Sequence, residues 1–480
     1  METSPKNDID RKARLQLPPV HASYRPPKLR IHDFEEALVL HTVEDAMAEA
    51  ARCLHCPNAP CQAACPLHND IPRALSLLEA GDITGAARVY QETNPQPEAC
   101  GRLCPQHFCQ DACTLNKAGK PIDMRRLEAF IATYQRRHGD MPLPELPPAT
   151  GKTVAVVGSG PSGLAVAESL RRRGHAVVVY ERYPRPGGLL VCGIPKFKLS
   201  LDIIKAKVHW LEALGIQFRC RTNIGTDITI TQLQEQYDAI FLGIGTHEHI
   251  YPGIPGEELD GVFEATEFLC RGNLPAKMLP PAWKRPHTIG PRVHVLGGGN
   301  TAIDCLRTAI RLSNVREASC YYRRSQAEMP ASAEEYDHAV EEGANFVWQV
   351  CPTAFLGDEK GKLRAVVYQR MTLCEPDASG RCRPEPIPDS EFTIEADTVV
   401  LALGYRPERD FTTHIPGLET NGRGTIKVKD QHTGETSVPG IFAAGDVVRG
   451  SDLLSPALAD ALHVAEAIHA YLRSQQSPGA

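Results

Sequence analysis

Two similar glycine-rich segments constrain the fold of this 480-residue chain more than any other feature. The first is TVAVVGSGPSGLAVAESLRRRGHAVVVYE, which is typical of an apolar strand, a glycine-rich turn, a helix and a second strand. The second, further along the chain, is RVHVLGGGNTAIDCLRTAIRLSNVREASCYYRR. A continuously apolar strand such as TVAVV is typical of a parallel sheet covered on both faces. The sequence therefore predicts two Rossmann-like α/β domains.

The first turn has the residues of a dinucleotide site. Its motif is Gly158-x-Gly160-x-x-Gly163, which provides a tight turn, close approach of a pyrophosphate and close packing of helix on strand. Glu181 follows Gly163 by 18 residues, where a carboxylate can accept hydrogen bonds from an adenosine ribose. The free N–H groups of the helix N-terminus favour the diphosphate. We expect nucleotide contacts from Gly158, Ser159, Gly160, Pro161, Ser162, Gly163, Glu181 and Arg182.

The second turn differs in the residue that follows its strand. Its motif comprises Gly297, Gly298, Gly299, Asn300 and Thr301, and the next strand ends in Arg323 and Arg324 instead of an acid. An arginine here can hold a ribose 2′-phosphate, which a carboxylate would repel. This favours NADP(H) over NAD(H). The alternative is that the two arginines form a solvated basic loop.

A third motif, Gly445-Asp446, lies in TSVPGIFAAGDVV near the C-terminus. Alone it would be read as an ordinary strand followed by a turn. Together with TVVLALGYRP at 398–407, it is typical of pyridine-nucleotide flavoproteins, in which such a pair approaches the flavin. On this interpretation the first glycine-rich unit binds FAD, and the second nucleotide-binding domain is inserted into the FAD domain.

Half of the sixteen cysteines lie in one short segment, at Cys53, Cys56, Cys61, Cys65, Cys100, Cys104, Cys109 and Cys113. The N-terminus has no apolar signal segment, so we expect a cytoplasmic protein, in which clustered cysteines more often bind metal than form disulfides. Only one C-x-x-C pair is present, and two cysteines precede prolines as in ferredoxin segments. The spacing favours two 4Fe–4S clusters; structural zinc and unliganded thiols are the alternatives.

The remaining pattern predicts a multidomain α+β protein. Residues 33 to 135 indicate helices: one capped by Asp33, two separated at Gly81, and one beginning at Pro121. The proline-rich stretch MPLPELPPAT predicts a linker near residue 150. We predict an α-helical iron–sulfur domain at 1–148, an FAD domain at 149–288 and 396–480, and an NADPH domain at 289–395. The net charge of −6 and the lack of a long apolar run argue against nucleic-acid binding and membrane insertion.

The chain resembles a known family through RIHDFEEA, EAARCLHC, CGRLCP, VVGSGPSGLA, PGGLLVCGIPKFKL, LGGGNTAIDC, YYRRSQAEMP, EEGANF and IFAAGDVV. These motifs are similar to those of the small (beta) subunit of bacterial NADPH-dependent glutamate synthases. The resemblance implies transfer of electrons from NADPH through FAD and the clusters to the FMN of a large (alpha) subunit that forms glutamate. Related modules in dihydropyrimidine dehydrogenases and ferredoxin:NADP oxidoreductases serve other acceptors, which is the alternative. A non-catalytic assembly protein is disfavoured by the intact motifs.

The resemblance also implies site residues. Cys53, Cys56, Cys61 and Cys113 would hold one cluster, and Cys65, Cys104 and Cys109 the other, with Glu128 or Cys100 as its fourth ligand. Gly188, Leu189 and Gly404 would contact the nucleotides. The chain departs from the family pattern at Cys192, which lacks a C-x-x-C partner, at Asn300, and at Ala461-Leu462 in the last helix.

Overall fold

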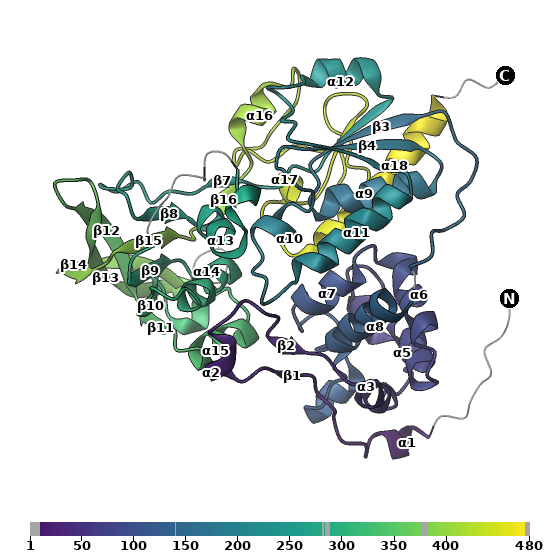
Figure 1. Cartoon of the computed structure of the whole chain (residues 1–480), viewed down its shortest axis with the longest axis horizontal. Coiled ribbons are helices and arrows are strands. Elements are labelled where there is room, and N and C mark those ends of the chain that lie inside the picture. Colours follow the sequence, from purple (N-terminus) through teal and green to yellow (C-terminus); the bar gives the residue numbers. More distant parts are fainter. Residues whose placement is uncertain (1–9, 140, 281–282, 284–288, 377–381, 476–480) are drawn as a thin grey trace.

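The computed structural model describes residues 10–139, 141–280, 283, 289–376 and 382–475. A helical N-terminal domain packs beside two α/β domains, and the second α/β domain is inserted between strands of the first (Figure 1). This arrangement confirms the predicted fold class. The predicted domain boundary at residue 288 and the polar residues 1–9 lie outside the described residues.

The N-terminal domain is a group of short helices around a buried apolar core. Two of these helices are separated at Gly81, as predicted, and their N-cap residues are Asp70 and Asp82, whose carboxylates accept backbone N–H groups. The elements are α1 (Arg11–Arg14), β1 (Ser23–Tyr24), α2 (Pro27–Arg30), β2 (Leu38–Val39), α3 (Val43–Ala50), α4 (Pro60–Ala64), α5 (Ile71–Glu79), α6 (Ile83–Thr93), α7 (Pro97–Leu103), η1 (Thr114–Ala118) and α8 (Met124–His138).

Two predicted helix starts in this domain are wrong. The helix expected from Asp33 begins only after Thr42, whose hydroxyl accepts the N–H of Asp45. Asp33 instead binds Arg25 at 2.6 Å, and strand β2 occupies part of the expected helix. The helix expected from Pro121 begins at Met124. Around Asp33, the pairing of β2 with β1 and the ion pair with Arg25 therefore overrode the local helical pattern.

The first α/β domain contains a parallel sheet with strand order β17-β6-β3-β4-β5. In β3, Val154 and Val156 pack on the side of α9 and α18, whereas Ala155 and Val157 pack on the side of α12. This explains why the strand is apolar throughout. The elements are β3 (Thr153–Val157), α9 (Pro161–Arg172), β4 (Ala176–Glu181), α10 (Leu189–Cys192), α11 (Leu201–Ala213), β5 (Gln217–Cys220), α12 (Ile230–Gln236), β6 (Ala239–Leu242), α16 (Arg409–Thr413), β17 (Ile441–Ala443), α17 (Asp446–Arg449) and α18 (Leu454–Ser474).

The second α/β domain has a parallel sheet of order β11-β10-β9-β15-β8. Strands β8 and β15 lie on either side of the predicted range 289–395 in the sequence, so this sheet extends beyond that range at both ends. The elements are β7 (Glu248–His249), β8 (Val262–Glu264), α13 (Ala265–Asn273), η2 (Ala276–Met278), β9 (Arg292–Leu296), α14 (Asn300–Ile310), β10 (Glu317–Tyr322), η4 (Gln326–Glu328), α15 (Ala333–Glu341), β11 (Asn345–Trp348), β15 (Thr398–Leu401) and β16 (Tyr405–Arg406).

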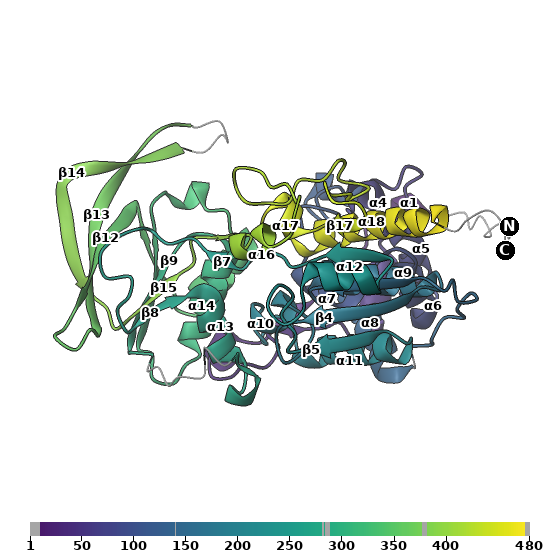
Figure 2. The ribbon, with the colours of Figure 1, turned by 90° about the horizontal axis from the view of Figure 1, so that it is seen from above.

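An antiparallel sheet that the sequence did not predict extends the second α/β domain. It consists of β12 (Val350–Gly357), β13 (Leu363–Pro376) and β14 (Cys382–Glu395). Figure 2 shows it at the end of the molecule far from the helical domain. Buried residues such as Val366 and Tyr368 alternate with more exposed ones along β13, so one face of this three-stranded sheet packs against the domain.

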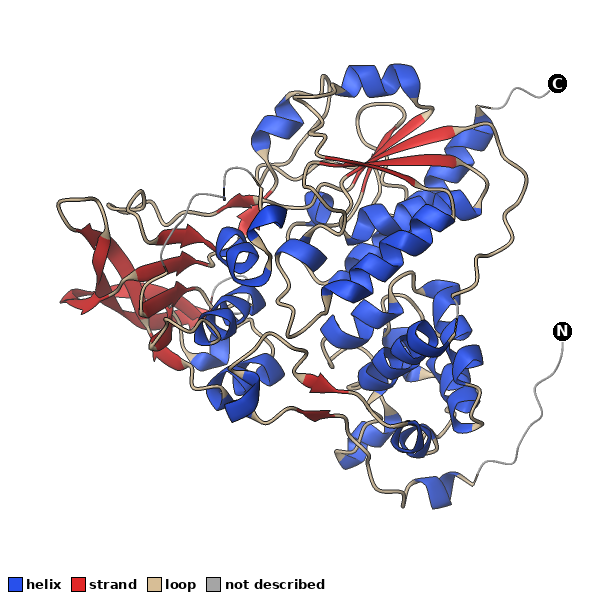
Figure 3. Ribbon diagram, in the orientation of Figure 1, coloured by secondary structure: helices blue, strands red, loops and turns tan. Residues whose placement is uncertain are grey.

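The helices gather in the N-terminal domain and around both parallel sheets, as Figure 3 shows. Among the helices that the structure describes, none is long and apolar enough to cross a membrane.

Candidate functional site

A cavity of about 310 Å³ lies between the two α/β domains and is lined by both. Twelve residues singled out from the sequence line it: Gly158, Ser159, Gly160, Pro161, Ser162, Glu181, Arg182, Gly188, Leu189, Asn300, Thr301 and Asp446. The other predicted nucleotide contacts do not form its walls; these are Gly163, Gly297, Gly298, Gly299, Arg323, Arg324, Gly404 and Gly445. The fold thus brings two distant glycine-rich turns to one space.

The first turn has the shape that a bound pyrophosphate requires. A Cβ on Gly163 would lie 2.0 Å from the carbonyl oxygen of Gly158, so only glycine allows α9 to pack this closely. A Cβ on Gly160 would meet no atom within 4 Å, so open space lies beside that residue. This space adjoins the N-terminus of the twelve-residue helix α9, where N–H groups favour an anion. The turn therefore fits the FAD diphosphate.

Glu181 is held rigidly at the end of β4. Its Oε2 accepts the backbone N–H of Ser159 at 3.2 Å and also the Ser159 hydroxyl, while Oε1 accepts the N–H of Tyr183 at 2.8 Å. The carboxylate is 5% exposed and lines the cavity. These bonds fix an acceptor where the sequence places the ribose. The neighbouring Arg182 forms an ion pair with Glu408 at 2.5 Å in the same wall.

The second turn is joined to α15 through Asn300. Its Oδ1 accepts the N–H of Ser332, the N-cap residue of α15, at 3.1 Å. The two arginines after β10 have different surroundings. Arg323 is exposed, whereas Arg324 is buried and donates from Nε to the carbonyl of Cys382 at 2.8 Å. Arg323 is therefore the one whose guanidinium is open to solvent.

Sequence reasoning missed a buried charged group in the cavity. Lys198 donates from Nζ to Asp304 at 2.9 Å and lies 3.0 Å from Glu335. Burial raises the pKa of Asp304 to about 6. Asp304 could have been identified from the sequence, because it lies four residues after Asn300 and therefore on the same face of α14. Burial also raises the pKa of Asp446, at the start of α17, to about 7.

The first group of cysteines surrounds a second, smaller cavity. Cys53, Cys56, Cys61 and Cys113 all line it, although Cys113 is far from the other three in sequence. The rest of the lining is mainly apolar, with Leu54, Pro72, Leu115, Ile122 and Met124. Four thiols that face one enclosed space match the donor set of an iron–sulfur cluster.

The second group of cysteines lies around Glu128. Cys65, Cys104 and Cys109 are each close enough to this carboxylate to interact with it electrostatically. Glu128 is 8% exposed and accepts hydrogen bonds from the side-chain amides of Asn94 at 2.8 Å and Asn69 at 3.4 Å. Burial raises its pKa well above the usual value.

Cys100 is the other candidate for a fourth ligand. It is buried next to Cys104, and its thiol donates to Oδ1 of Asn94 at 3.7 Å. Both candidates therefore contact the same asparagine. Within the described parts of the chain, no three His, Cys, Asp or Glu side chains are grouped as they would be around a single metal ion.

The large cavity and the two cysteine groups are neighbours. Leu103 lines the large cavity, and the next residue, Cys104, belongs to the second cysteine group. The buried Tyr90 interacts electrostatically with Cys109 and Cys65 of the second group and with Cys61 of the first. The three sites thus follow one another through the protein.

Comparison with known proteins agrees with this arrangement. Residues 30–140 match the family described as dihydropyrimidine dehydrogenase domain II, 4Fe-4S cluster, and residues 152–461 match pyridine nucleotide-disulphide oxidoreductase. The chain is 38% identical over 463 residues to the glutamate synthase (NADPH) small chain of Escherichia coli (strain K12), covering 95% of this chain and 98% of that one. The chain belongs to the glutamate synthase small-chain family.

Two further proteins are similar to this chain in sequence, and one solved structure shares the fold of its α/β part. The small chain from Halomonas elongata is 39% identical over 459 residues, covering 93% of this chain and 95% of that one. The putative oxidoreductase AegA of Escherichia coli (strain K12) is 39% identical over 470 residues, covering 94% and 70%. Mycobacterium tuberculosis FprA in complex with NADPH shares the fold, with a TM-score of 0.57 at 21% identity over 67% of this chain and 85% of that one.

Membership of this family confirms the predicted resemblance and the predicted class of enzyme. The protein is an NADPH-dependent flavoprotein oxidoreductase whose cofactors are FAD, NADPH and 4Fe–4S clusters. It therefore acts as an electron-input module. The assignment of single residues to each cofactor remains a prediction.

Proposed function

We propose that this chain is the electron-input subunit of a glutamate synthase. It would oxidise NADPH and deliver electrons through FAD and two 4Fe–4S clusters to the FMN of a large (alpha) subunit that forms glutamate. The relatives named glutamate synthase (NADPH) small chain support this partner, since their own lengths are almost fully covered. When bound, FAD accepts a hydride from NADPH and releases electrons one at a time to clusters.

The observation that carries the proposal is the adjacency of Leu103 and Cys104. Leu103 lines the cavity that fits FAD, and Cys104 lies among the second group of thiols. An electron that leaves this cavity would pass Leu103 and reach Cys104, which we assign to the second cluster. Tyr90 then bridges to the first group. This order supports an electron path between the nucleotide cavity and the two clusters.

We assign roles to the chain's residues on this basis. The turn at Gly158 to Gly163 and the carboxylate of Glu181 would hold FAD, with Gly188, Leu189, Gly445 and Asp446 beside it. The turn at Gly297 to Thr301 would hold NADPH, with Arg323 at its 2′-phosphate. Cys53, Cys56, Cys61 and Cys113 would bind one cluster. Cys65, Cys104, Cys109 and Glu128 would bind the other, and Cys100 is the alternative to Glu128.

The electron exit would lie at the first cysteine group. A surface hollow beside Cys113 is lined by Pro60, Asp111, Ala112, Thr114, Asn116 and Lys117. Cys56, which is only partly buried, also lies near this surface and bonds to Thr114 at 3.1 Å. We propose that the large subunit docks over this hollow.

A second candidate has its own support. AegA is as similar to this chain as the small chains are, at 39% identity, and carries no glutamate synthase name. The same module could therefore supply another acceptor, as in a dihydropyrimidine dehydrogenase or a ferredoxin:NADP oxidoreductase.

Co-purification from the native host tests the proposal. We expect an FMN-containing chain of roughly three times this mass, and NADPH oxidation that depends on glutamine and 2-oxoglutarate in the complex. Recovery of a different acceptor would support the second candidate. The isolated chain should reduce ferricyanide with NADPH in either case, and its failure to do so when loaded with FAD would contradict both.

A further inference from the structure

Arg125 of α8 joins two segments that carry cysteines of the second group. Its Nη1 donates to the backbone carbonyl of Cys104 at 2.8 Å. Its Nε donates to Oε1 of Gln110 at 2.6 Å, and Gln110 follows Cys109 directly in the sequence. Arg125 is 5% exposed. A buried guanidinium thus holds together the segments of two predicted cluster ligands.

The charge of Arg125 is close enough to act on these ligands. It acts electrostatically on the thiols of both Cys104 and Cys109, where it favours the thiolate forms. Arg125 also precedes Glu128 by three residues, so the two side chains share one face of α8. A cluster gains negative charge when it takes up an electron. A buried cation near its ligands stabilises that reduced form and therefore raises the reduction potential.

A carboxylate of the second α/β domain opposes this charge. Glu334, in the first turn of α15, accepts from Nη1 and Nη2 of Arg125 at 3.2 and 3.1 Å. Its other oxygen lies 2.6 Å from Nη2 of Arg126. Burial favours the neutral carboxyl, but the charges of Arg126 and Arg125 outweigh burial and hold the pKa of Glu334 well below its usual value. Glu334 is therefore ionised at neutral pH and partly neutralises Arg125.

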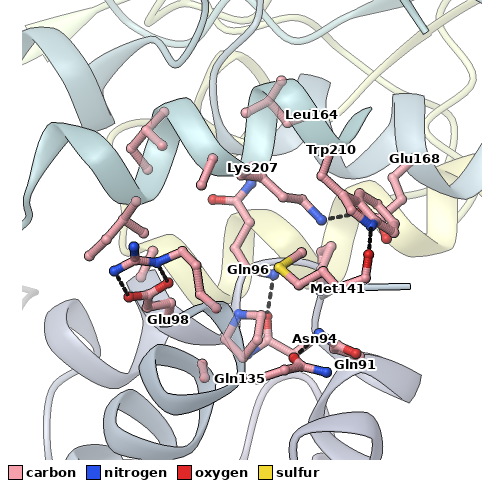
Figure 4. A pocket seen from close by; sticks show the side chains of 18 of the residues that line it. Gln91, Asn94, Gln96, Glu98, Gln135, Met141, Leu164, Glu168, Lys207 and Trp210 are labelled. Atoms are coloured by element: carbon pink, nitrogen blue, oxygen red, sulfur yellow. Dashed lines mark hydrogen bonds and ion pairs between the residues drawn. The ribbon is translucent and has the colours of Figure 1, made fainter. Parts of the chain in front are cut away.

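The first α/β domain meets the helical domain through contacts of another kind. Figure 4 shows the pocket at this interface. Glu98 binds Arg136 within the helical domain, and Lys207 binds Glu168 within the α/β domain. The hydrogen bond that Gln96 makes across the interface joins two neutral groups. Among the described residues at this pocket, no ion pair joins the two domains, in contrast to the contact at Glu334.

We propose that Arg125 and Glu334 shift the reduction potential of the second 4Fe–4S cluster in opposite directions. The guanidinium raises the potential, and the carboxylate lowers it by neutralising part of that charge. Both are positioning residues, because they act through the segments that carry Cys104 and Cys109. This inference rests on the proposed function, since it takes those cysteines as ligands of a cluster.

The position of Glu334 makes the potential depend on the arrangement of the domains. Ser332, the N-cap residue of α15, donates its N–H to Oδ1 of Asn300 in the second glycine-rich turn at 3.1 Å. Helix α15 therefore links the predicted NADPH turn at one side to Arg125 at the other. This link does not pass through the cavity that fits FAD. The cluster would have its proper potential only while the second α/β domain is docked on α8.

Redox titration of the anaerobic holoprotein, followed by electron paramagnetic resonance, tests the proposal. The signal of the second cluster is the one that Cys65→Ser alters. Glu334→Gln should raise its midpoint potential, and Arg125→Gln should lower it. We expect each variant to change the equilibrium between the oxidised and the reduced cluster by about tenfold, which is about 59 mV for one electron. General loss of packing would not produce shifts of opposite sign.

Two further variants separate charge from structure. Arg125→Lys keeps the positive charge, so its potential should stay closer to that of the unmodified protein than the potential of Arg125→Gln. Glu341→Gln is the matched control for Glu334→Gln, because Glu341 lies in the same helix but binds Arg30 and is 51% exposed. This variant should leave the potential unchanged. Glu334 is 31% exposed, so Glu334→Gln gives a test even if Arg125→Gln does not fold.

The outcomes distinguish this inference from the proposed function. Shifts of the same sign in Glu334→Gln and Arg125→Gln, equal shifts in Glu334→Gln and Glu341→Gln, or an unchanged potential in Glu334→Gln would overturn the inference alone. A protein without iron at the second cysteine group would instead contradict the proposed function. Because the readout is a potential, it does not depend on the rate of NADPH oxidation or on the identity of the acceptor.

Discussion

Arg30 and Glu342 form a buried ion pair that joins the N-terminal segment to the second α/β domain. Nε of Arg30 lies 2.6 Å from Oε1 of Glu342, and their side chains are 1% and 0% exposed. Glu342 also accepts hydrogen bonds from Arg307 and Arg311 of the same domain. A second link binds Arg126 of α8 to Glu334 of α15 at 2.6 Å. These pairs hold the nucleotide-binding and helical domains in one arrangement.

Glu342→Gln should therefore destabilise the protein by about 3–5 kcal/mol, because it leaves buried arginines without their counter-charge. The matched control is Glu341→Gln. Glu341 binds the same Arg30 at 2.9 Å but is 51% exposed, so its loss should cost no more than about 1 kcal/mol. Urea unfolding followed by circular dichroism measures both. Similar losses for the two variants would show that burial does not decide the contribution of this pair.

Arg323→Ala should weaken the binding of NADPH by about 10- to 100-fold and leave NADH nearly unchanged, because a charge-assisted contact to phosphate is lost. Steady-state oxidation of each nucleotide with ferricyanide gives the comparison. Arg324→Ala should lower the stability of the folded protein, because the variant loses the hydrogen bond from Nε of Arg324 to the carbonyl of Cys382. Equal weakening of both nucleotides by Arg323→Ala would mean that this arginine does not recognise the 2′-phosphate.

The protein prepared without oxygen should contain roughly eight irons and eight acid-labile sulfides per chain, as two 4Fe–4S clusters require. Cys113→Ser should alter the same electron paramagnetic resonance signal as Cys53→Ser, because both thiols line one cavity. Cys65→Ser should alter the other signal. A shared signal for Cys53→Ser and Cys65→Ser would refute the two ligand sets while leaving the iron content intact.

The fourth ligand of the second cluster can be identified by a further pair of variants. Glu128→Ala should change the signal that Cys65→Ser changes, whereas Cys100→Ser should leave it unchanged. Both residues lie beside Asn94, so general disturbance of the surroundings would affect both variants alike. The reverse result would assign the ligand to Cys100.

Stability should fall in acid because of His294. Its ring is 2% exposed, with Nδ1 3.0 Å from the hydroxyl of Tyr368 and Nε2 3.2 Å from that of Tyr321. Burial lowers its pKa from 6.5 to about 4. Between these values the unfolded chain binds the proton and the folded chain does not, so stability is lost as pH falls from about 6.5 through 4. The loss should approach about 3 kcal/mol.

Unfolding midpoints measured from pH 7 to pH 4 test this in the unmodified protein and in His294→Asn. The variant should show a shallower decline, because asparagine does not titrate. An identical decline in both proteins would place the acid sensitivity elsewhere.

Much of the fold followed from short segments. The glycine-rich turns predicted both parallel sheets, because Gly163 and its neighbours act through local backbone geometry that a short segment specifies. The helix start at Asp33 was predicted wrongly because Arg25, outside the helical pattern, binds that carboxylate. The antiparallel sheet of β12 to β14 was missed because β14 is largely exposed and the buried residues of β13 alternate with more exposed ones, so neither strand has a continuous apolar run.

The sequence by itself determined which chemistry this protein can hold: two dinucleotide turns, eight clustered thiols and membership of an electron-transfer family. Tertiary structure decided which of those groups meet. The folded chain places Cys113 at the cavity of Cys53, and it places Leu103 in the wall of the nucleotide cavity beside Cys104. The physical reason is the distance along the chain between interacting residues. A turn or a helix is stabilised by residues that are neighbours in sequence. The burial and partners of Glu128 or His294 depend instead on segments far away in the chain.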